Sequence, residues 1–180
     1  SKTHITGDNI ILASGSKPRT LPGFEIDGDL ILTSEELLSM TTIPKSVAII
    51  GGGAIGVEFA SALNDFGSEV TILEALPSIL SGCDADLSKT VSRSFKKRGI
   101  EVLVNCKVSG HTKKTAGLTL HLDDRDIEVE KVVVSIGRRP FADLLGLKDT
   151  GIVVDTAGYI PVDRFCRTDE DGVYAIGDLI

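Results

Sequence analysis

Four glycines interrupt the most hydrophobic stretch of the chain, "SVAIIGGGAIGVEFASAL", which runs from Ser46 to Leu63. Gly51, Gly53 and Gly56 fit the pattern G-x-G-x-x-G. In this pattern the first glycine permits a tight turn, the second lets the backbone approach a pyrophosphate, and the third lets a helix pack against a strand. The spacing therefore predicts a site for an anionic dinucleotide. A strand–helix turn that is merely tight is the structural alternative.

The carboxylate of Glu74 follows 18 residues after Gly56, at the end of a second apolar segment. A carboxylate at this distance can accept hydrogen bonds from the hydroxyls of an adenosine ribose, and it would repel a 2′-phosphate. Residues 75–88 contain no Lys or Arg, so no cation there compensates for such a phosphate. Glu74 and the absence of nearby cations therefore favour NAD over NADP. The alternative is that Glu74 is a surface glutamate with no functional role.

The glycine pattern is informative only between a strand and a helix, and the sequence supplies both. Residues 46–50 are typical of a buried strand, residues 54–66 of a helix and residues 69–73 of a second strand. Connections this short predict that the two strands are parallel and that the crossover is right-handed. The expected apolar face of the helix is formed by Ile55, Phe59, Ala62 and Phe66.

The rest of the chain supplies the other elements of an α/β fold. A helix is expected over residues 84–98, with Leu87, Val91 and Phe95 on its apolar face, and a short helix capped by Ser34 runs to Met40. Three strands of an antiparallel meander are expected within residues 108–130. Further strands are expected at residues 9–13, 100–104, 131–136, 152–155, 160–162 and 173–176. The predicted fold class is therefore α/β, a Rossmann-like parallel sheet with an antiparallel β-meander.

Composition argues against several functional classes. A net charge of −7 and an aromatic content of 4% disfavour nucleic acid as a partner. Cys83, Cys106 and Cys166 contain no CxxC pair, which disfavours a metal site and favours free thiols in a reducing compartment. Residues 46–63 have the length of a membrane span, but Glu58 and the four glycines disfavour that interpretation. We therefore expect no metal, no nucleic acid and no membrane partner.

Six segments, taken in order, resemble the pyridine nucleotide-disulfide oxidoreductase family: "NIILASGSKPR", "GGGAIGVEFA", "GSEVTILE", "KVVVSIGRRPF", "GYIPVDRFCRT" and "GVYAIGDLI". In that family an NAD domain is inserted into an FAD domain. The resemblance implies an FAD-domain segment and linker over residues 1–30, an NAD domain over 31–147 and a returning FAD-domain segment over 148–180. Strands of an FAD-binding domain would thus flank the Rossmann-like sheet. The implied activity is reoxidation of dihydrolipoamide, with electrons passing through a disulfide and FAD to NAD.

The resemblance also implies residue roles. Glu74 would bind the adenosine ribose, and Gly137 would bring backbone close to the nicotinamide ribose. Glu58 would lie near the nicotinamide, with a helix glutamate that is only exposed to water as the alternative. The residues implied for NAD are Gly51, Gly52, Gly53, Ala54, Ile55, Gly56, Val57, Glu58, Glu74, Val108 and Gly137. Those implied for FAD are Ser14, Gly15, Ser16 and Asp178, where Ser14 stands in place of the family's usual Thr. For Arg138 and Arg139 two interpretations are open, a structural role and a contact with a ligand.

The sequence departs from the family because it has no CxxxxC pair for a redox disulfide. It also lacks the family's N-terminal glycine motif for FAD and the C-terminal dimerisation domain with its catalytic His and Glu. We therefore expect the central third of a longer enzyme, with no catalytic residue of its own, that folds and binds NAD(H) without holding FAD.

The resemblance also implies partners for the complete enzyme. These are the lipoyl domains of a 2-oxoacid dehydrogenase complex and a second copy in a homodimer, in the cytoplasm or the mitochondrial matrix. A glutathione- or mercury-reducing flavoenzyme and a free-standing NAD-binding module are the alternatives.

Overall fold

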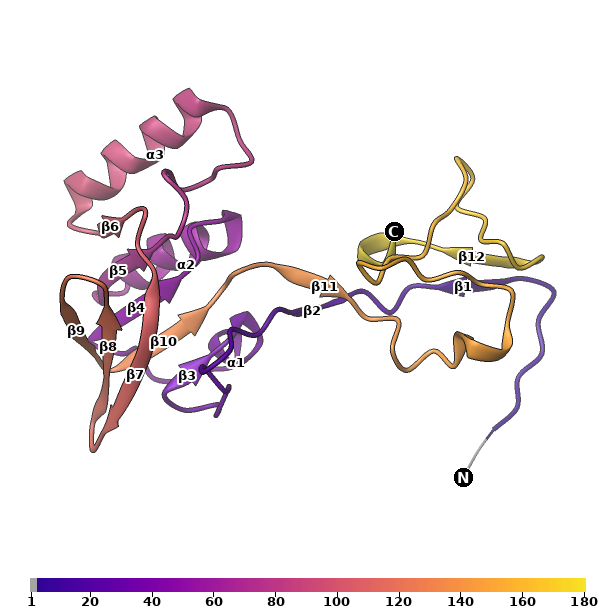
Figure 1. The fold of residues 1–180 in the computed structure, drawn as a ribbon, viewed down its shortest axis with the longest axis horizontal. Coiled ribbons are helices and arrows are strands. Elements are labelled where there is room, and N and C mark those ends of the chain that lie inside the picture. The colour runs from indigo at the N-terminus through magenta and orange to yellow at the C-terminus, as the bar shows by residue number, and fades with distance from the viewer. Residues whose placement is uncertain (1–2) are drawn as a thin grey trace. The chain divides into compact units, whose positions relative to one another are not determined.

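The computed structural model describes residues 3–180, which divide into two compact units (Figure 1). The central unit is Pro18–Gly137. The flanking unit consists of the described residues up to Lys17 together with Arg138–Ile180. The expected boundaries at 30/31 and 147/148 refer to cofactor domains, and they stay a prediction.

Within the described residues, the central unit contains a parallel sheet of five strands. Their order is β3 (Ile31–Leu32), β10 (Lys131–Val134), β4 (Ser46–Ile50), β5 (Glu69–Leu73) and β6 (Glu101–Leu103). Every neighbouring pair in this sheet is parallel. The expected strands at residues 46–50, 69–73, 100–104 and 131–136 are confirmed, the last two in slightly shorter form.

The helices of the central unit are α1 (Ser34–Leu38), α2 (Ala54–Asp65) and α3 (Ala85–Arg98). Asp84 caps α3, and Gly99 ends it in the left-handed region at φ 83°. The cap of α1 is Thr33, so the expectation of Ser34 was wrong by one residue. The reason is a reciprocal capping box, in which Glu36 accepts a hydrogen bond from the Thr33 N–H. Among the helices of residues 3–180, none combines the length and apolar character needed to cross a membrane.

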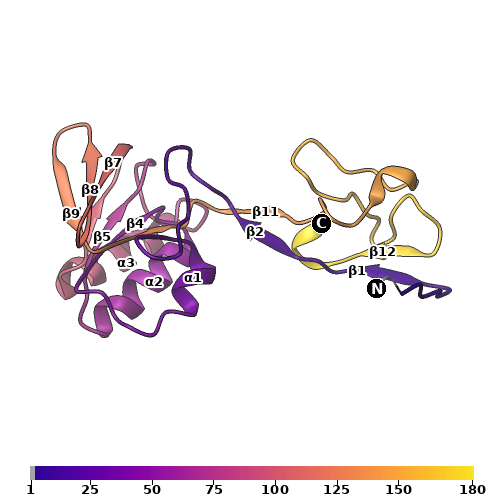
Figure 2. The ribbon, with the colours of Figure 1, turned by 90° about the horizontal axis from the view of Figure 1, so that it is seen from below.

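The sheet separates two hydrophobic layers, because successive side chains of a strand point to opposite faces. On β4, Val47 and Ile49 pack against the helices, while Ala48 and Ile50 pack against an antiparallel meander. The meander is formed by β7 (Val108–Lys114), β8 (Gly117–Leu122) and β9 (Asp126–Val129). Figure 2 shows the helices and the meander on opposite sides of the sheet. The predicted fold class, a parallel sheet with an antiparallel meander, is confirmed.

The buried faces of the helices match the predicted ones in part. The residues that α2 buries are Gly56, Val57, Ala60 and Leu63, whereas Phe66 is 69% exposed. Gly56 and Ala60 let the helix approach the sheet closely. Of the predicted face, Phe59 is partly buried and packs against the core, Ile55 is half-buried, and Ala62 and Phe66 are exposed. On α3 the prediction is confirmed for Phe95, which is buried, and for Val91, which packs against the core, whereas Leu87 is 51% exposed and Ser88 is buried instead.

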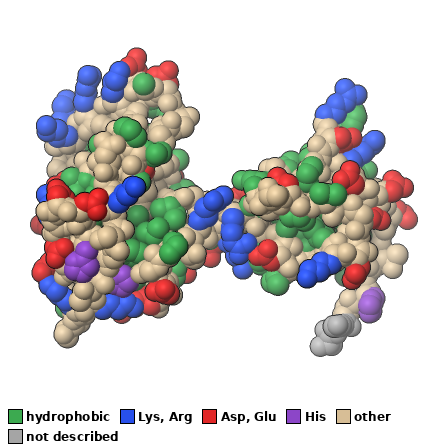
Figure 3. Space-filling model, viewed as in Figure 1, with side chains coloured by type: hydrophobic (Ala, Val, Ile, Leu, Met, Phe, Trp, Pro, Cys, Tyr) green, Lys and Arg blue, Asp and Glu red, His purple; other side chains and the backbone are tan. Residues whose placement is uncertain are grey.

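The flanking unit contains two short strand pairs. β1 (Ile10–Leu12) pairs in parallel with β12 (Val173–Ala175), and β2 (Ser16–Pro18) pairs with β11 (Arg138–Pro140). Single 3-10 turns, η1 (Leu147–Asp149) and η2 (Gly177–Leu179), complete its regular structure in the described chain. The core of this unit is small, and Figure 3 shows hydrophobic side chains reaching its surface.

Two expected strands are absent from the flanking unit as described: residues 152–155 and 160–162 have no strand structure. Asp155 turns the chain there instead. Its carboxylate accepts hydrogen bonds from the N–H groups of Ala157 and Tyr159, at 2.8 Å each. A side chain that satisfies nearby backbone donors competes with sheet pairing, so this segment forms a local turn.

Candidate dinucleotide-binding site

The strands β4 and β10 are neighbours inside the central sheet, and the order of the strands changes direction between them. The candidate site lies at their carboxyl ends. From β4 the chain proceeds through α2 to β5 on one side, whereas β10 lies on the other side of β4. In open parallel sheets, ligands bind in the crevice at such a switch point. Gly51 follows β4 there, and Ser135, Ile136 and Gly137 follow β10.

The glycines of the turn between β4 and α2 serve different purposes. Gly51 has φ 111°, and a Cβ at this position would lie 2.5 Å from the carbonyl oxygen of Ser135. A Cβ on Gly56 would lie 2.1 Å from the carbonyl oxygen of Gly51. In contrast, no other part of the described chain comes within 4 Å of a Cβ built on Gly53. The first and third glycines therefore permit packing, while the second faces the open space that a bound phosphate would need.

The N-terminus of α2 presents backbone donors to the same space. Gly53 is the N-cap, and the first intrahelical bond runs from the Val57 N–H to the Gly53 carbonyl at 3.0 Å. The N–H groups of the helical residues before Val57 therefore precede the hydrogen-bond ladder of the helix. Gly53 and Ala54 are both exposed. Such an N-terminus, with its partial positive charge, suits an anionic group.

Two other residues of α2 were predicted to contact NAD, and of these Glu58 is exposed whereas Val57 is buried. The Glu58 side chain is exposed, on the turn that follows the helix N-terminus. Val57 is 9% exposed and packs in the core between α2 and the sheet. The side chain of Val57 therefore faces the core, and only its backbone, through the N–H bond to the Gly53 carbonyl, contacts the turn.

Glu74 lies beside the glycine turn and is held there by backbone donors. Its Oε2 accepts a hydrogen bond from the Gly52 N–H at 2.6 Å, and its Oε1 accepts one from the Leu76 N–H at 2.7 Å. An ionised carboxylate has about four acceptor sites, so both oxygens can still accept a hydroxyl. The sequence predicted this position for Glu74 but gave no sign that the side chain also anchors the turn.

The segment after Glu74 contacts the glycine turn at Gly52, through Ile79 and Leu80. A Cβ on Gly52 would lie 2.6 Å from Cγ2 of the fully buried Ile79. The Leu80 N–H donates to the Gly52 carbonyl at 2.7 Å, and the Ser88 hydroxyl donates to the Ile79 carbonyl at 2.7 Å. The turn is thus fixed by contacts on both sides of Gly52.

Two further predicted NAD contacts lie at other strand boundaries. Val108 begins β7 and packs against the core between sheet and meander. Gly137 is exposed beyond β10, with φ 115°, and its carbonyl accepts the Arg19 N–H at 2.9 Å.

The residues predicted for FAD lie in the flanking unit, where Ser16 and Asp178 come together. The Ser16 hydroxyl donates to the Asp178 carboxylate and accepts from Nε of Arg138 at 2.6 Å. The Ser14 hydroxyl donates to the Phe141 carbonyl at 2.6 Å. Gly15 has φ 70°. The Asp178 side chain is 64% exposed, so its carboxylate remains accessible.

Arg138 supports this group of residues. Its Nη2 donates to the Ser16 carbonyl at 2.7 Å, in addition to the Nε bond to the Ser16 hydroxyl. Arg139 instead pairs with Asp143 at 2.7 Å. The structure therefore gives both arginines contacts within the protein.

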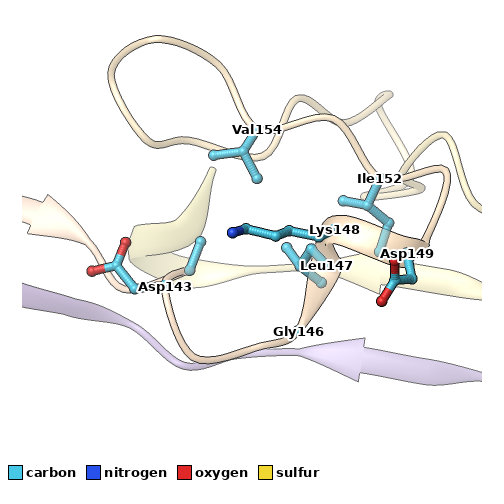
Figure 4. Close-up of a pocket in the computed structure, with 8 residues that line it drawn as sticks. Asp143, Gly146, Leu147, Lys148, Asp149, Ile152 and Val154 are labelled. Atoms are coloured by element: carbon cyan, nitrogen blue, oxygen red, sulfur yellow. The ribbon is translucent and has the colours of Figure 1, made fainter.

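The flanking unit also has a cavity of about 550 Å³ that contains none of the predicted site residues. In Figure 4 the Lys148 side chain lies across it, between Leu147 and Val154. In residues 3–180, no three His, Cys, Asp or Glu side chains are arranged to hold a metal ion. All three cysteines lie among the described residues, and none is in a disulfide.

The turn, the helix N-terminus and the carboxylate that follows β5 form an arrangement typical of dinucleotide-binding α/β units. The family model for pyridine nucleotide-disulphide oxidoreductases matches residues 1–180. The chain belongs to that family.

Its similar relatives include two bacterial enzymes named dihydrolipoyl dehydrogenase. The one from Bacillus subtilis is 42% identical over 182 residues, which cover 95% of this chain and 37% of that protein. The one from Cupriavidus necator is 38% identical over 181 residues, which cover 98% of this chain and 38% of that protein. The chain thus spans less than half the length of these relatives.

Solved structures give a consistent result. LpdA from Mycobacterium tuberculosis superposes with a TM-score of 0.87 at 33% identity, covering 96% of this chain and 38% of that one. The HOCl-induced flavoprotein disulfide reductase RclA from Escherichia coli gives a TM-score of 0.89 at 30% identity, covering 97% of this chain and 41% of that one, in its Cu(II) complex.

Proposed function

We propose that this chain is the NAD-binding part, with adjoining FAD-binding strands, of an enzyme that reoxidises dihydrolipoamide. Electrons would pass from the dithiol through a disulfide and FAD to NAD. The observation that carries the proposal is the open face of Gly53 at the switch point, beside the helix N-terminus and Glu74. The relatives named dihydrolipoyl dehydrogenase support the choice of reaction.

The residues of the central unit fit NAD. The backbone donors at Gly53, Ala54, Ile55 and Gly56 would bind the pyrophosphate, and Glu74 would accept hydrogen bonds from the adenosine ribose. Val108 would contact the adenine side, and Gly137 the nicotinamide ribose. NAD, when bound, supplies the nicotinamide that exchanges a hydride with a flavin. Glu58, exposed on α2, would orient the nicotinamide end.

The residues of the flanking unit fit one part of FAD. Asp178, exposed and held by Ser16, would accept hydrogen bonds from the ribityl or phosphate portion. Ser14 and Ser16 donate their hydroxyl protons within the protein. They would therefore line the cofactor through their backbone and as hydrogen-bond acceptors.

A second candidate is another flavin-dependent disulfide reductase. Its support is the superposition on RclA, with a TM-score of 0.89. Identity to the RclA structure is 30%, against 42% to the dihydrolipoyl dehydrogenase of Bacillus subtilis, which favours the first candidate. In the whole enzyme we propose NAD(H), lipoyl domains of a 2-oxoacid dehydrogenase complex and a second copy as partners, in a reducing intracellular compartment.

The choice of nucleotide tests the proposal. We expect the chain to bind NADH at least about tenfold more tightly than NADPH, a difference of about 1.4 kcal/mol, because Glu74 repels a 2′-phosphate. Glu74→Ala should remove most of this preference, and it should also weaken NADH binding because Gly52 and Leu76 lose their acceptor. Calorimetric titration of both nucleotides measures the two affinities.

Glu69→Ala is the matched control, since Glu69 is an exposed glutamate at the opposite end of the same strand. This variant should keep both the affinity and the preference. NADPH binding as tight as NADH binding in the wild-type chain would contradict the proposed role of Glu74.

A further inference from the structure

Ser135 is the polar residue that ends the apolar run of β10, and it contacts the glycine turn from the opposite wall of the crevice. Its N–H donates to the Ile50 carbonyl at 2.8 Å. Its hydroxyl is directed between two carbonyl oxygens, that of Gly51 at 3.1 Å and that of Ile50 at 3.3 Å. The side chain therefore joins the ends of β10 and β4 at the point where the turn begins.

Ser135 occupies the space that two glycines leave, with its hydroxyl at Gly56 and its backbone carbonyl at Gly51. A Cβ on Gly56 would lie 2.7 Å from Oγ of Ser135, and a Cβ on Gly51 would lie 2.5 Å from the Ser135 carbonyl oxygen. Three segments thus converge on Ser135: the end of β10, the start of the turn and the first turn of α2. Gly51 adopts φ 111° at this convergence, a conformation that glycine reaches readily and that other residues rarely adopt.

We propose that Ser135 is a positioning residue that holds the glycine turn in the conformation that binds a dinucleotide. This inference rests on the proposed function for its ligand. The hydroxyl itself points at backbone carbonyls of the turn, so it acts through the turn. Its loss would leave the half-buried Gly51 carbonyl without this donor and would release the turn from β10.

The test compares Ser135→Ala with Ser68→Ala in this chain. Ser68 is a matched control because its buried hydroxyl also donates to a backbone carbonyl, that of Pro44 at 2.6 Å, just before β5 at the opposite edge of the sheet. NADH affinity is measured by titration. Amide hydrogen exchange is measured at Gly51 and Gly52, whose N–H groups donate to the Leu73 carbonyl and to Glu74.

We expect Ser135→Ala to weaken NADH binding by about three- to tenfold, the value of one hydrogen bond that is fully coupled to binding. Exchange at Gly51 and Gly52 should become faster. Ser68→Ala should lower stability and leave both readouts unchanged, so a general loss of stability is distinguished from release of the turn.

Unchanged exchange at Gly51 and Gly52 in Ser135→Ala would overturn the inference, whatever the chain binds. Faster exchange with unchanged NADH affinity would overturn it as well, because the turn would then be released without effect on the ligand. Failure of the wild-type chain to bind NADH would instead contradict the proposed function, and the positioning role would fall with it.

Discussion

The central and flanking units differ in how much core supports the residues predicted to bind a cofactor. Among the described residues, the central unit has 13 buried side chains on the helix side of its sheet and 11 on the meander side. The flanking core has four buried side chains. In that unit Ile11 and Phe165 are 63% and 55% exposed. The glycine turn is therefore supported by a well-packed sheet, whereas the group at Ser16 and Asp178 depends on hydrogen bonds and a thin core.

Core truncation should show the largest contrast between the units. Ile72 in the central unit is 0% exposed and Ile160 in the flanking unit is 1% exposed. Ile72→Ala should lower the free energy of unfolding of the central unit by about 3–5 kcal/mol, because its dense surroundings cannot collapse into the cavity. Ile160→Ala should cost less, about 2 kcal/mol, because a small core relaxes more easily.

Hydrogen exchange resolved by residue measures the two effects separately, since each variant should affect amides of its own unit first. Equal losses in both units would mean that the flanking core is as tightly packed as the central one, and the comparison would fail.

Alanine at two of the glycines should separate stability from binding within the central unit. Gly56→Ala places a Cβ 2.1 Å from a backbone oxygen, so we expect a loss of about 1–3 kcal/mol in stability together with loss of NADH binding. At Gly53 an added methyl group meets no other part of the described chain within 4 Å, and φ is a permissive −72°, so Gly53→Ala should keep its stability. Its methyl group would nevertheless obstruct a pyrophosphate, and NADH affinity should fall at least about tenfold.

Thermal unfolding and NADH titration of both variants measure these effects. If Gly53→Ala binds NADH as well as the wild type does, the open face of the turn is not where the phosphates lie.

A smaller effect should distinguish two aspartates that close similar turns. Burial by itself raises the pKa of Asp27, but hydrogen bonds from the Ile31 N–H, Lys113 and the Asp29 N–H outweigh it and hold the pKa well below its usual value. In the flanking unit, the Arg167 N–H lowers the pKa of Asp163, burial opposes this, and the Phe165 N–H lowers it further. Asp27→Asn should cost the central unit about 1 kcal/mol at pH 7, and Asp163→Asn should have less effect.

The pH dependence has a definite sign. The pKa of Asp27 is lower in the folded chain than in the unfolded chain, so its contribution is complete above the unfolded value of about 4. The contribution is lost as the pH falls below that value toward the folded pKa. Urea unfolding of wild type and Asp27→Asn between pH 7 and pH 2 should therefore show the difference shrinking at low pH. A difference that is constant with pH would mean that the charge of Asp27 does not stabilise the fold.

The sequence was sufficient where its signals are local. The unit β4–α2–β5 could be predicted because hydrophobic runs, glycine spacing and Glu74 all lie within about 30 residues. The buried face of α2 was predicted only in part, because it is centred on Gly56 and Ala60, whose small size lets the helix pack closely, and the hydrophobic pattern favours larger side chains instead. The strands expected at residues 152–155 and 160–162 failed because Asp155 supplies a local turn.

Long-range support of the site was not visible in the sequence. Ser135 contacts Gly51 across 84 residues, and its signal was only one polar residue after "KVVV". The anchoring of Gly52 by Glu74 spans 22 residues, and the contact of Ser16 with Asp178 spans 162. Such contacts depend on which strands become neighbours, and short sequence patterns carry no information on that.

The position of β10 between β3 and β4 has a consequence for the order in which the molecule is made. During synthesis, β3, α2 and β5 leave the ribosome before β10 does, yet β3 has β10 as its sheet neighbour in the described structure. Until residues 131–137 have been translated, β3 has no place in the sheet and the crevice has only one wall. A ligand that needs both walls of the crevice can therefore bind only after β10 has joined the sheet.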